Sequence, residues 1–407
     1  MGKDQKDLKR TTPQLIESRN FETQTHYITT SDGYILTVYR IINPYLRHKS
    51  SDLKPILLQH GFTANSDEFL VSRIGSIDAN GKYSEDNRVT DCNRLARVGK
   101  TLGFVLSACG YDRKQVLNKS HDTRPQRGSP LLRVGKTLGF VLSACGYDVW
   151  LSNIRGNKYS TNHTTLDPKE DHHFWRFTID ELSQIDLPVI IDYIRKQTDK
   201  PKIGYIGYSM GTTLMFALLS SQPEYSGVID PFIALAPVVY LSRLPKYLKQ
   251  FTILEPFLRA FPMPLIRFGY LRKLTTEILS GQELTDHMAY MNAMAAHLID
   301  ESSTLVLSHY LQMISNDNFG RYDYGLSQNL YLYGSPKSPD YPLANITSHR
   351  IAFIESPEND IFSGHEDLQR LKSELKVDLL MDYRIPDNKW THVDYLFHNR
   401  ADKYVTK

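Results

Sequence analysis

Short apolar runs alternate with helical patterns along most of the chain. Runs suited to buried strands occur at 56–59, 202–208, 232–236, 349–355 and 377–385. A helical pattern at 211–220 directly follows the second run. Strands separated by helices need crossover connections, which build a mostly parallel sheet with helices on both faces. The alternation therefore predicts an α/β fold.

Further upstream, two signals mark helix starts. Thr178 and Glu181 have the spacing of a capping box, in which each side chain satisfies a free backbone amide. Pro188 suits the first turn of a further helix through Lys196.

The stretch 240–318 breaks this alternation. It is rich in Leu, Met and aromatic residues and contains no convincing strand pattern. A helical insert near the strand ends is the natural place for a cap or lid. We therefore predict a core made of 13–239 and 319–400, with a helical cap over 240–318.

One segment of sixteen residues occurs twice, letter for letter, at 97–112 and 133–148. Two identical copies do not fit a solenoid, so a recent duplication or an assembly error explains them better. Only the second copy continues into a β-branched, aromatic run suited to a strand. We expect 133–154 to form a helix and then a strand, and 113–148 to be an insertion.

The repeat also contains a triplet that resembles part of a phosphate-binding loop. Gly99-Lys100-Thr101 and Gly135-Lys136-Thr137 resemble the end of that motif. The loop needs a glycine five residues before its second glycine, and those positions hold Arg94 and Pro130. A helix start is the preferred interpretation.

Charge and composition exclude several classes. Lys and Arg number 48 against 45 Asp and Glu, a net charge of +3 that gives no reason to expect nucleic acid as a partner. The longest apolar stretches have about ten residues, and a membrane span needs roughly 20. Three cysteines offer no disulfide framework and no metal-ligand spacing.

The first ten residues, MGKDQKDLKR, are too charged for the apolar core of a secretory signal. Lys6 also stands where a myristoylation motif requires Ser or Thr. The expectation is a cytosolic chain or a true start upstream of Met1.

The pentapeptide Gly207-Tyr208-Ser209-Met210-Gly211 lies between a strand pattern and a helix pattern. A nucleophile on such a turn has a strained backbone, and neighbouring glycines let the turn close. The pentapeptide alone is a weak signal. Its strand–turn–helix context favours Ser209 as a nucleophile over an ordinary turn serine.

A serine hydroxyl needs a base to take its proton. In sheets with this turn, an acid and then a histidine follow the serine along the chain. Asp360 follows a strand end at the edge of the sheet where ligands bind. Asp367 and Asp382 compete, but we place them on a helix surface and inside a strand. His392 follows the last strand and is distinguished from the other histidines by that position.

Two backbone amides are expected to stabilise the developing negative charge. Met210 follows the nucleophile and supplies one. Phe62, in the loop after the strand that ends at His60-Gly61, supplies the other. His60 precedes the serine, the wrong order for a base, so a structural role in its loop is favoured.

Together these segments resemble the animal acid lipases, the gastric and lysosomal lipase relatives within the α/β-hydrolase superfamily. The similarity covers most of 13–400 and includes KPILLQHGFTANSDEF, GYDVWLSNIRGNKYS and IGYIGYSMGTT. It implies an α/β-hydrolase fold with Ser209 as nucleophile, Asp360 as acid and His392 as base. Phe62 and Met210 would be the oxyanion donors.

The resemblance also implies a substrate class. Neutral lipid esters such as acylglycerols or sterol esters would be cleaved at a lipid–water interface without metal or cofactor, in a secreted or lysosomal setting. Tyr208 departs from the family, which commonly has His at this position. We expect this difference to adjust the catalytic rate without abolishing activity. The cap matches poorly, which leaves chain-length preference open, and the sequence does not determine the oligomeric state.

Two alternatives stay open beside the lipase hypothesis. One is a carboxylesterase for small esters, against which the long apolar cap weighs. The other is a non-catalytic lipid-binding protein on the same scaffold, because fold does not fix function. The presence of all three members of a Ser-His-Asp set argues against the second alternative.

Overall fold

The computed structural model describes residues 7, 9–46, 52–71, 75–78, 83–85, 88–89, 137–265, 297, 299–397 and 401–405. The first copy of the repeat, the linker between the copies and both Gly-Lys-Thr triplets except Thr137 lie outside the described residues. The expectation that 113–148 is an insertion therefore stays a prediction. Thr137 directly precedes α5 (Leu138–Ala144), which confirms the predicted helix start for the second triplet.

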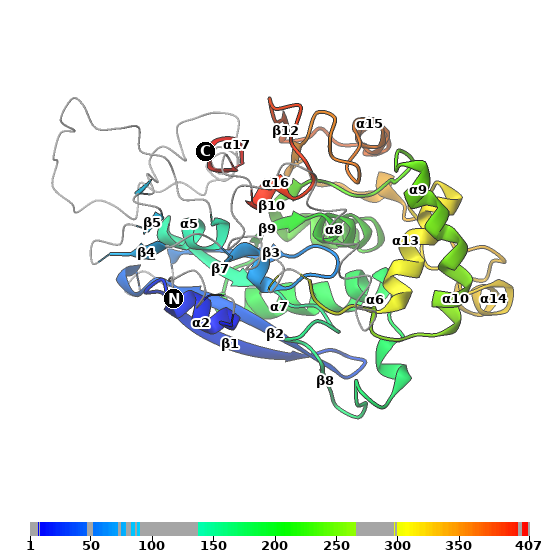
Figure 1. Ribbon diagram of the computed structural model, residues 1–407, viewed down its shortest axis with the longest axis horizontal. Coiled ribbons are helices and arrows are strands. Elements are labelled where there is room, and N and C mark those ends of the chain that lie inside the picture. The colour runs from blue at the N-terminus through cyan, green and yellow to red at the C-terminus, as the bar shows by residue number, and fades with distance from the viewer. Residues whose placement is uncertain are drawn as a thin grey trace.

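A mixed sheet forms the centre of the molecule (Figure 1). Its described strands follow the order β1-β2-β7-β3-β9-β10-β11-β12, with β8 beside β2. Strands β1, β2 and β7 pair antiparallel, and every pair from β7 to β12 is parallel. The predicted α/β architecture with a mostly parallel sheet is confirmed. The strands are β1 (Glu22–Thr29), β2 (Tyr34–Ile42), β3 (Lys54–Gln59), β7 (Tyr147–Leu151), β8 (Asn162–His163), β9 (Ile203–Tyr208), β10 (Ile229–Leu235), β11 (Ile351–Glu355) and β12 (Met381–Arg384). A small second sheet contains β4 (Gly75–Ile77), β5 (Tyr83–Glu85) and β6 (Arg88–Val89).

Both faces of the central sheet are covered by apolar cores. Along β3, Leu57 belongs to one core, while Ile56 and Leu58 belong to the other. Successive side chains of a strand point to opposite faces, so a strand buried on both sides must be apolar at every position. This explains why the strands read as continuous apolar runs in the sequence.

The helices divide between these two cores. Helices α7 and α8 pack on the Leu57 side, whereas α2, α5 and α16 pack on the Ile56 side. The described helices outside the cap are α2 (Thr12–Glu17), α5 (Leu138–Ala144), α6 (Ile179–Glu181), α7 (Leu187–Thr198), α8 (Met210–Ser221), α14 (Leu326–Tyr333), α15 (His365–Glu374), α16 (Asp394–Phe397) and α17 (Ala401–Tyr404). Short 3₁₀ turns lie at η2 (Ser66–Phe69), η4 (His172–Trp175), η6 (Pro223–Gly227) and η9 (Leu343–Asn345).

The predicted helix starts are present. Thr178 and Glu181 form the capping box at α6, and Pro188 lies in the first turn of α7. A π-helical turn at 182–186 joins α6 to α7, so the two predicted helices are one continuous helical stretch.

The second copy of the repeat forms α5 and then β7, which confirms the predicted helix-then-strand unit over its described residues. The expectation of no disulfide is wrong, because Cys145 is disulfide-bonded. Its partner lies outside the described residues. Counting cysteines could not reveal this bond, because a pairing depends on which thiols the fold brings together.

The described part of the cap segment contains helices and, between Pro264 and Ser303, an isolated β-bridge. It contains α9 (Lys246–Lys249), the 3₁₀ turn η7 (Gln250–Leu254), α10 (Glu255–Ala260) and α13 (Thr304–Asn316). Figure 1 shows these helices together at one side of the sheet. The division at 239 and 318 stays a prediction. Within the described ranges, no helix has the length and apolar character that crossing a bilayer would require.

Candidate active site

Ser209 lies on a sharp turn between β9 and α8. Its backbone adopts φ 52° and ψ −116°, a left-handed conformation that is strained for a residue with a side chain. A Cβ on Gly207 would lie 2.7 Å from the carbonyl carbon of Gly211, and a Cβ on Gly211 would lie 2.5 Å from the carbonyl oxygen of Gln59. Glycine is therefore required on both sides for the turn to close.

The structure brings Ser209, His392 and Asp360 into one hydrogen-bonded chain. The Nε2 atom of His392 is 2.7 Å from Ser209 Oγ, and its Nδ1 atom is 2.8 Å and 2.9 Å from the two carboxylate oxygens of Asp360. A carboxylate only accepts, so Nδ1 carries the proton and Nε2 is free to accept from the serine hydroxyl. This arrangement can activate a serine for attack on a carbonyl carbon.

Asp360 is buried and oriented by its own loop after β11. Besides His392, its Oδ1 accepts hydrogen bonds from the backbone amides of Phe362 and Ser363, each at 3.0 Å. The two competing acids lie elsewhere. Asp367 is on α15 as expected, but it is buried and accepts from the Ser242 hydroxyl and the Arg243 amide. Asp382 is in β12 and pairs with Lys372 at 2.7 Å.

The loop that carries His392 is attached to the serine turn through Tyr208. The Tyr208 hydroxyl donates to the backbone carbonyl of His392 at 2.7 Å, and the two rings are 5.4 Å apart. On the other side, the Ser356 hydroxyl donates to the carbonyl of Trp390 at 2.6 Å. The departure from the family at Tyr208 thus has a definite structural role, which sequence reasoning missed.

His60 and Gly61 form the loop after β3, the strand that neighbours β9. His60 Nδ1 is 2.9 Å from the Gly61 carbonyl oxygen, while Nε2 faces the Asn157 side-chain nitrogen at 3.3 Å. The carbonyl can only accept, so Nδ1 carries the proton. Burial lowers the pKa of His60 to about 4, which keeps the ring neutral. Both ring nitrogens thus have polar partners, Nδ1 within the loop and Nε2 at Asn157 after β7, as a structural role requires.

The two expected oxyanion donors lie on the two loops just described. Met210 is the first residue of α8, and amides of the first helical turn have no acceptor within the helix. Phe62 follows Gly61, and its half-buried ring packs 5.6 Å from the ring of Tyr310. Their role as donors stays a prediction. Among the described residues, no cluster of His, Cys, Asp and Glu could hold a metal ion.

Comparison with known families gives two matches that fit this geometry. A partial alpha/beta-hydrolase lipase region matches residues 12–73, which include the His60-Gly61 loop. An alpha/beta hydrolase fold matches residues 137–230, which include the Ser209 turn. The chain therefore has an α/β-hydrolase fold, and its N-terminal part is similar to the lipase region of such hydrolases.

Its curated relatives match over nearly the whole chain. Lipase 1 of Drosophila melanogaster is 26% identical, covering 94% of this chain and 75% of the relative. The gastric triacylglycerol lipase of Bos taurus is 27% identical, with 96% and 88% covered. The human lysosomal acid lipase/cholesteryl ester hydrolase is 25% identical, with 94% and 86% covered.

A buried glutamate holds the loop beside the serine. Glu68 lies on η2, and its Oε2 accepts from the Gly61 amide at 2.8 Å. Burial raises the pKa of Glu68 to about 8. Sequence reasoning missed this residue. The available signal was an acid pair, Asp67-Glu68, that directly precedes the apolar Phe69 and Leu70.

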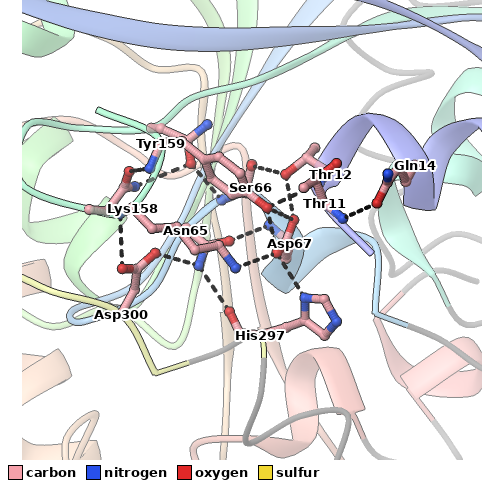
Figure 2. Close-up of polar contacts among 12 residues, drawn as sticks. Thr11, Thr12, Gln14, Asn65, Ser66, Asp67, Lys158, Tyr159, His297 and Asp300 are labelled. Atoms are coloured by element: carbon pink, nitrogen blue, oxygen red, sulfur yellow. Dashed lines mark hydrogen bonds and ion pairs between the residues drawn. The ribbon is translucent and has the colours of Figure 1, made fainter. Parts of the chain in front are cut away.

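A polar network connects the same region to the residues just before α13 (Figure 2). Asp67 accepts from Lys158 Nζ at 2.8 Å and from Tyr159 and faces His297 Nδ1 at 2.9 Å. Asn65 donates to Asp300 at 2.7 Å, and the Asp300 amide donates to the carbonyl of Thr63 at 2.7 Å. The loop after β3 is therefore joined to the end of the cap by buried hydrogen bonds.

The two acids of this network are shifted in opposite directions. Burial alone would raise the pKa of Asp67, but its contacts with His297 and Lys158 outweigh burial and lower it. Burial raises the pKa of Asp300 to about 6, although the Glu301 amide and Lys158 act in the opposite direction. The difference is that Asp67 contacts the Lys158 ammonium and the His297 ring directly, whereas Asp300 contacts Lys158 through its backbone amide.

Proposed function

We propose that this α/β-hydrolase is a serine lipase that cleaves neutral lipid esters through Ser209, His392 and Asp360. The observation that carries the proposal is the continuous hydrogen-bonded chain from Ser209 Oγ through the imidazole to the Asp360 carboxylate. The strained turn at Ser209 supports it, because such strain persists where a side chain must be held for chemistry.

In the first half of the reaction, His392 Nε2 takes the hydroxyl proton as Ser209 Oγ attacks the ester carbonyl carbon. Asp360 keeps the proton on Nδ1 and stabilises the imidazolium that forms. The amides of Phe62 and Met210 donate to the oxyanion, and α8 adds the positive end of its dipole. Collapse of the tetrahedral intermediate transfers the His392 proton to the leaving alcohol and leaves an acyl-enzyme.

In the second half, water attacks the acyl carbon while His392 Nε2 accepts a proton from it. The same amides stabilise the second oxyanion. Collapse releases the carboxylic acid and returns the proton to Ser209 Oγ. The cycle needs no group beyond these side chains and amides.

Two observations support lipids as the substrate class. The bovine and human relatives are a triacylglycerol lipase and a cholesteryl ester hydrolase by name. The cap also presents large apolar side chains to solvent, and such a patch suits docking at a lipid–water interface. These exposed residues are Tyr247, Phe251, Ile253, Leu254, Phe257 and Phe261.

The second candidate is a carboxylesterase for small soluble esters, since the same three residues would serve either substrate. Comparing kcat/KM on short-chain and long-chain esters separates the two. A lipase is expected to prefer long chains and to gain activity above the solubility limit of the ester. Higher activity on soluble short chains, without that gain, would favour the esterase.

Covalent labelling with a fluorophosphonate probe tests the serine itself. We expect wild-type protein to label and to hydrolyse esters, and Ser209→Ala to lose both, with a fall in kcat of at least about 10⁴-fold. Ser221→Ala, at the other end of α8, is the matched control and should label normally. Folded wild-type protein that neither labels nor hydrolyses would favour the lipid-binding alternative.

The same labelling can be applied to a chain that lacks 113–148. Labelling of both chains would mean that the enzyme works with the duplicated segment in place. Labelling of the shortened chain alone would mean that the segment blocks an otherwise intact site.

A further inference from the structure

Glu68 is a buried carboxyl group that the proposed mechanism does not use. It is 6% exposed, and its Oε2 accepts a hydrogen bond from the backbone amide of Gly61. Burying a carboxyl group is costly unless its partners stabilise it. A buried carboxyl group at this position is therefore expected to have a role in holding the neighbouring backbone.

Gly61 lies directly against the proposed nucleophile. A Cβ built on Gly61 would be 3.4 Å from Ser209 Cβ and 3.4 Å from Tyr208 Cδ1. A methyl group at this position would therefore be in van der Waals contact with the serine, which places the Gly61 backbone close to the nucleophile. A shift of Gly61 would change the position of the loop relative to Ser209 Oγ.

Two side chains fix the two peptide groups of Gly61. Glu68 accepts from its amide, and the Nδ1–H of His60 donates to its carbonyl oxygen. A trans peptide is planar, so the Phe62 N–H points opposite to the Gly61 carbonyl in the same plane. Fixing Gly61 on both sides therefore fixes the direction of the Phe62 amide.

We propose that Glu68 is a positioning residue that holds the oxyanion amide of Phe62, and that it does so as a neutral carboxylic acid. This inference rests on the proposed function, because it assigns a task to the loop beside Ser209. Glu68 itself touches neither the serine nor the substrate position. Its effect passes through Gly61.

The surroundings of Glu68 favour the neutral form. Burial raises its pKa to about 8, against which the Gly61 amide alone acts. No cation pairs with it among the described residues, and a negative charge on Glu68 adds to burial in raising the pKa of Tyr208 on β9. The neighbouring His60 is neutral, and its ring contacts the Gly61 carbonyl and the Asn157 side chain. A carboxylate here would place negative charge next to the site where the oxyanion develops.

Two substitutions separate position from charge. Glu68→Leu removes the acceptor, and we expect kcat to fall about 10- to 100-fold with little change in KM, since a misplaced donor weakens transition-state binding. Glu68→Gln keeps an uncharged acceptor and should restore most of that loss. Wild-type kcat/KM should decline about tenfold above pH 8, whereas Glu68→Gln should hold its activity there. Glu181→Gln, in the capping box of α6, is the matched control and should keep the wild-type pH profile.

One measurement does not depend on activity. In protein labelled with ¹⁵N-glycine, the Gly61 amide signal of the wild type should titrate near pH 8, and that of Glu68→Gln should not. This comparison also serves if Glu68→Leu does not fold.

The outcomes distinguish the two proposals. A wild-type protein that labels with fluorophosphonate while Glu68→Gln keeps the alkaline decline, or while the Gly61 signal does not titrate, overturns the role of Glu68 alone. A folded wild-type protein that does not label overturns the proposed function, and the oxyanion role of Glu68 falls with it.

Discussion

Two loops meet at the site, and they are held in different ways. The turn at Ser209 is fixed by its own backbone, because Gly207 and Gly211 allow contacts that no Cβ would permit. The loop at Gly61 is fixed by side chains, with Glu68 on its amide and His60 on its carbonyl. The first constraint is steric and insensitive to pH, whereas the second depends on the protonation of its partners.

The two loops are also linked. A Cβ on Gly211 would strike the carbonyl oxygen of Gln59, the residue that precedes His60. The glycine that closes the serine turn thus also lets the other loop approach. A short motif thus encodes one half of the site, while the other half depends on residues that become neighbours only in the folded chain.

The largest effect is expected from Gly211→Ala, which disrupts the Ser209 turn, the loop that is fixed by close backbone contacts. Alanine has the better helix propensity by about 1 kcal/mol, but a Cβ 2.5 Å from a backbone oxygen forces the strand and helix apart. We expect a net loss of about 3 kcal/mol of unfolding free energy and most of the activity. Urea denaturation and ester hydrolysis measure both. Gly227→Ala is the control, since nothing lies within 4 Å of its Cβ position, and an equal loss there would contradict the steric argument.

A smaller effect on activity is expected from Glu68→Gln. This variant tests whether the Gly61 loop depends on pH while the Ser209 turn does not. The ordinary pKa of 4.5 applies to Glu68 in the unfolded chain, and the folded value is about 8. Between these values the folded protein keeps a proton that the unfolded chain has released, so wild-type stability falls as pH rises. The variant lacks this titration. Its stability relative to wild type should therefore rise by about 2.5 kcal/mol between pH 5 and pH 7.

Denaturation of both proteins at pH 5, 7 and 9 measures that difference, and all other titrating groups cancel in the comparison. A constant difference across this range would mean that Glu68 does not change its charge.

The smallest effect is expected from Tyr208→Phe, which detaches the His392 loop from the serine turn. The lost hydrogen bond leaves a buried carbonyl without its donor, at a cost of about 1 kcal/mol. We expect kcat to fall several-fold, with the strained turn itself intact. Tyr225→Phe loses a comparable bond to Asp192 far from the site and should leave kcat unchanged. Equal kcat in both variants would mean that Tyr208 does not position His392.

Much of the fold was predictable because its strands and helices follow from the local pattern of apolar and polar residues. The strands at β3, β9, β10 and β11 were expected within a few residues of their observed bounds, since strands buried on both faces must be apolar throughout. Strand β12 is shorter than the expected 377–385, because only Met381–Arg384 pairs with its neighbour. The disulfide of Cys145 was missed, as was the burial of Asp367, because both depend on distant segments.

The sequence by itself determined the order of strands and helices, the glycine-flanked turn at Ser209, and the positions of Asp360 and His392 after strand ends. These follow from steric limits and from residue order, which act along the chain. Only the tertiary structure decided that Tyr208 holds the His392 loop, that Glu68 holds Gly61, and that Asp67 and Asp300 tie this region to the end of the cap. The physical reason is that a hydrogen bond between buried side chains is specified by proximity in space, and residues far apart in sequence acquire that proximity through the packing of the sheet and its two cores.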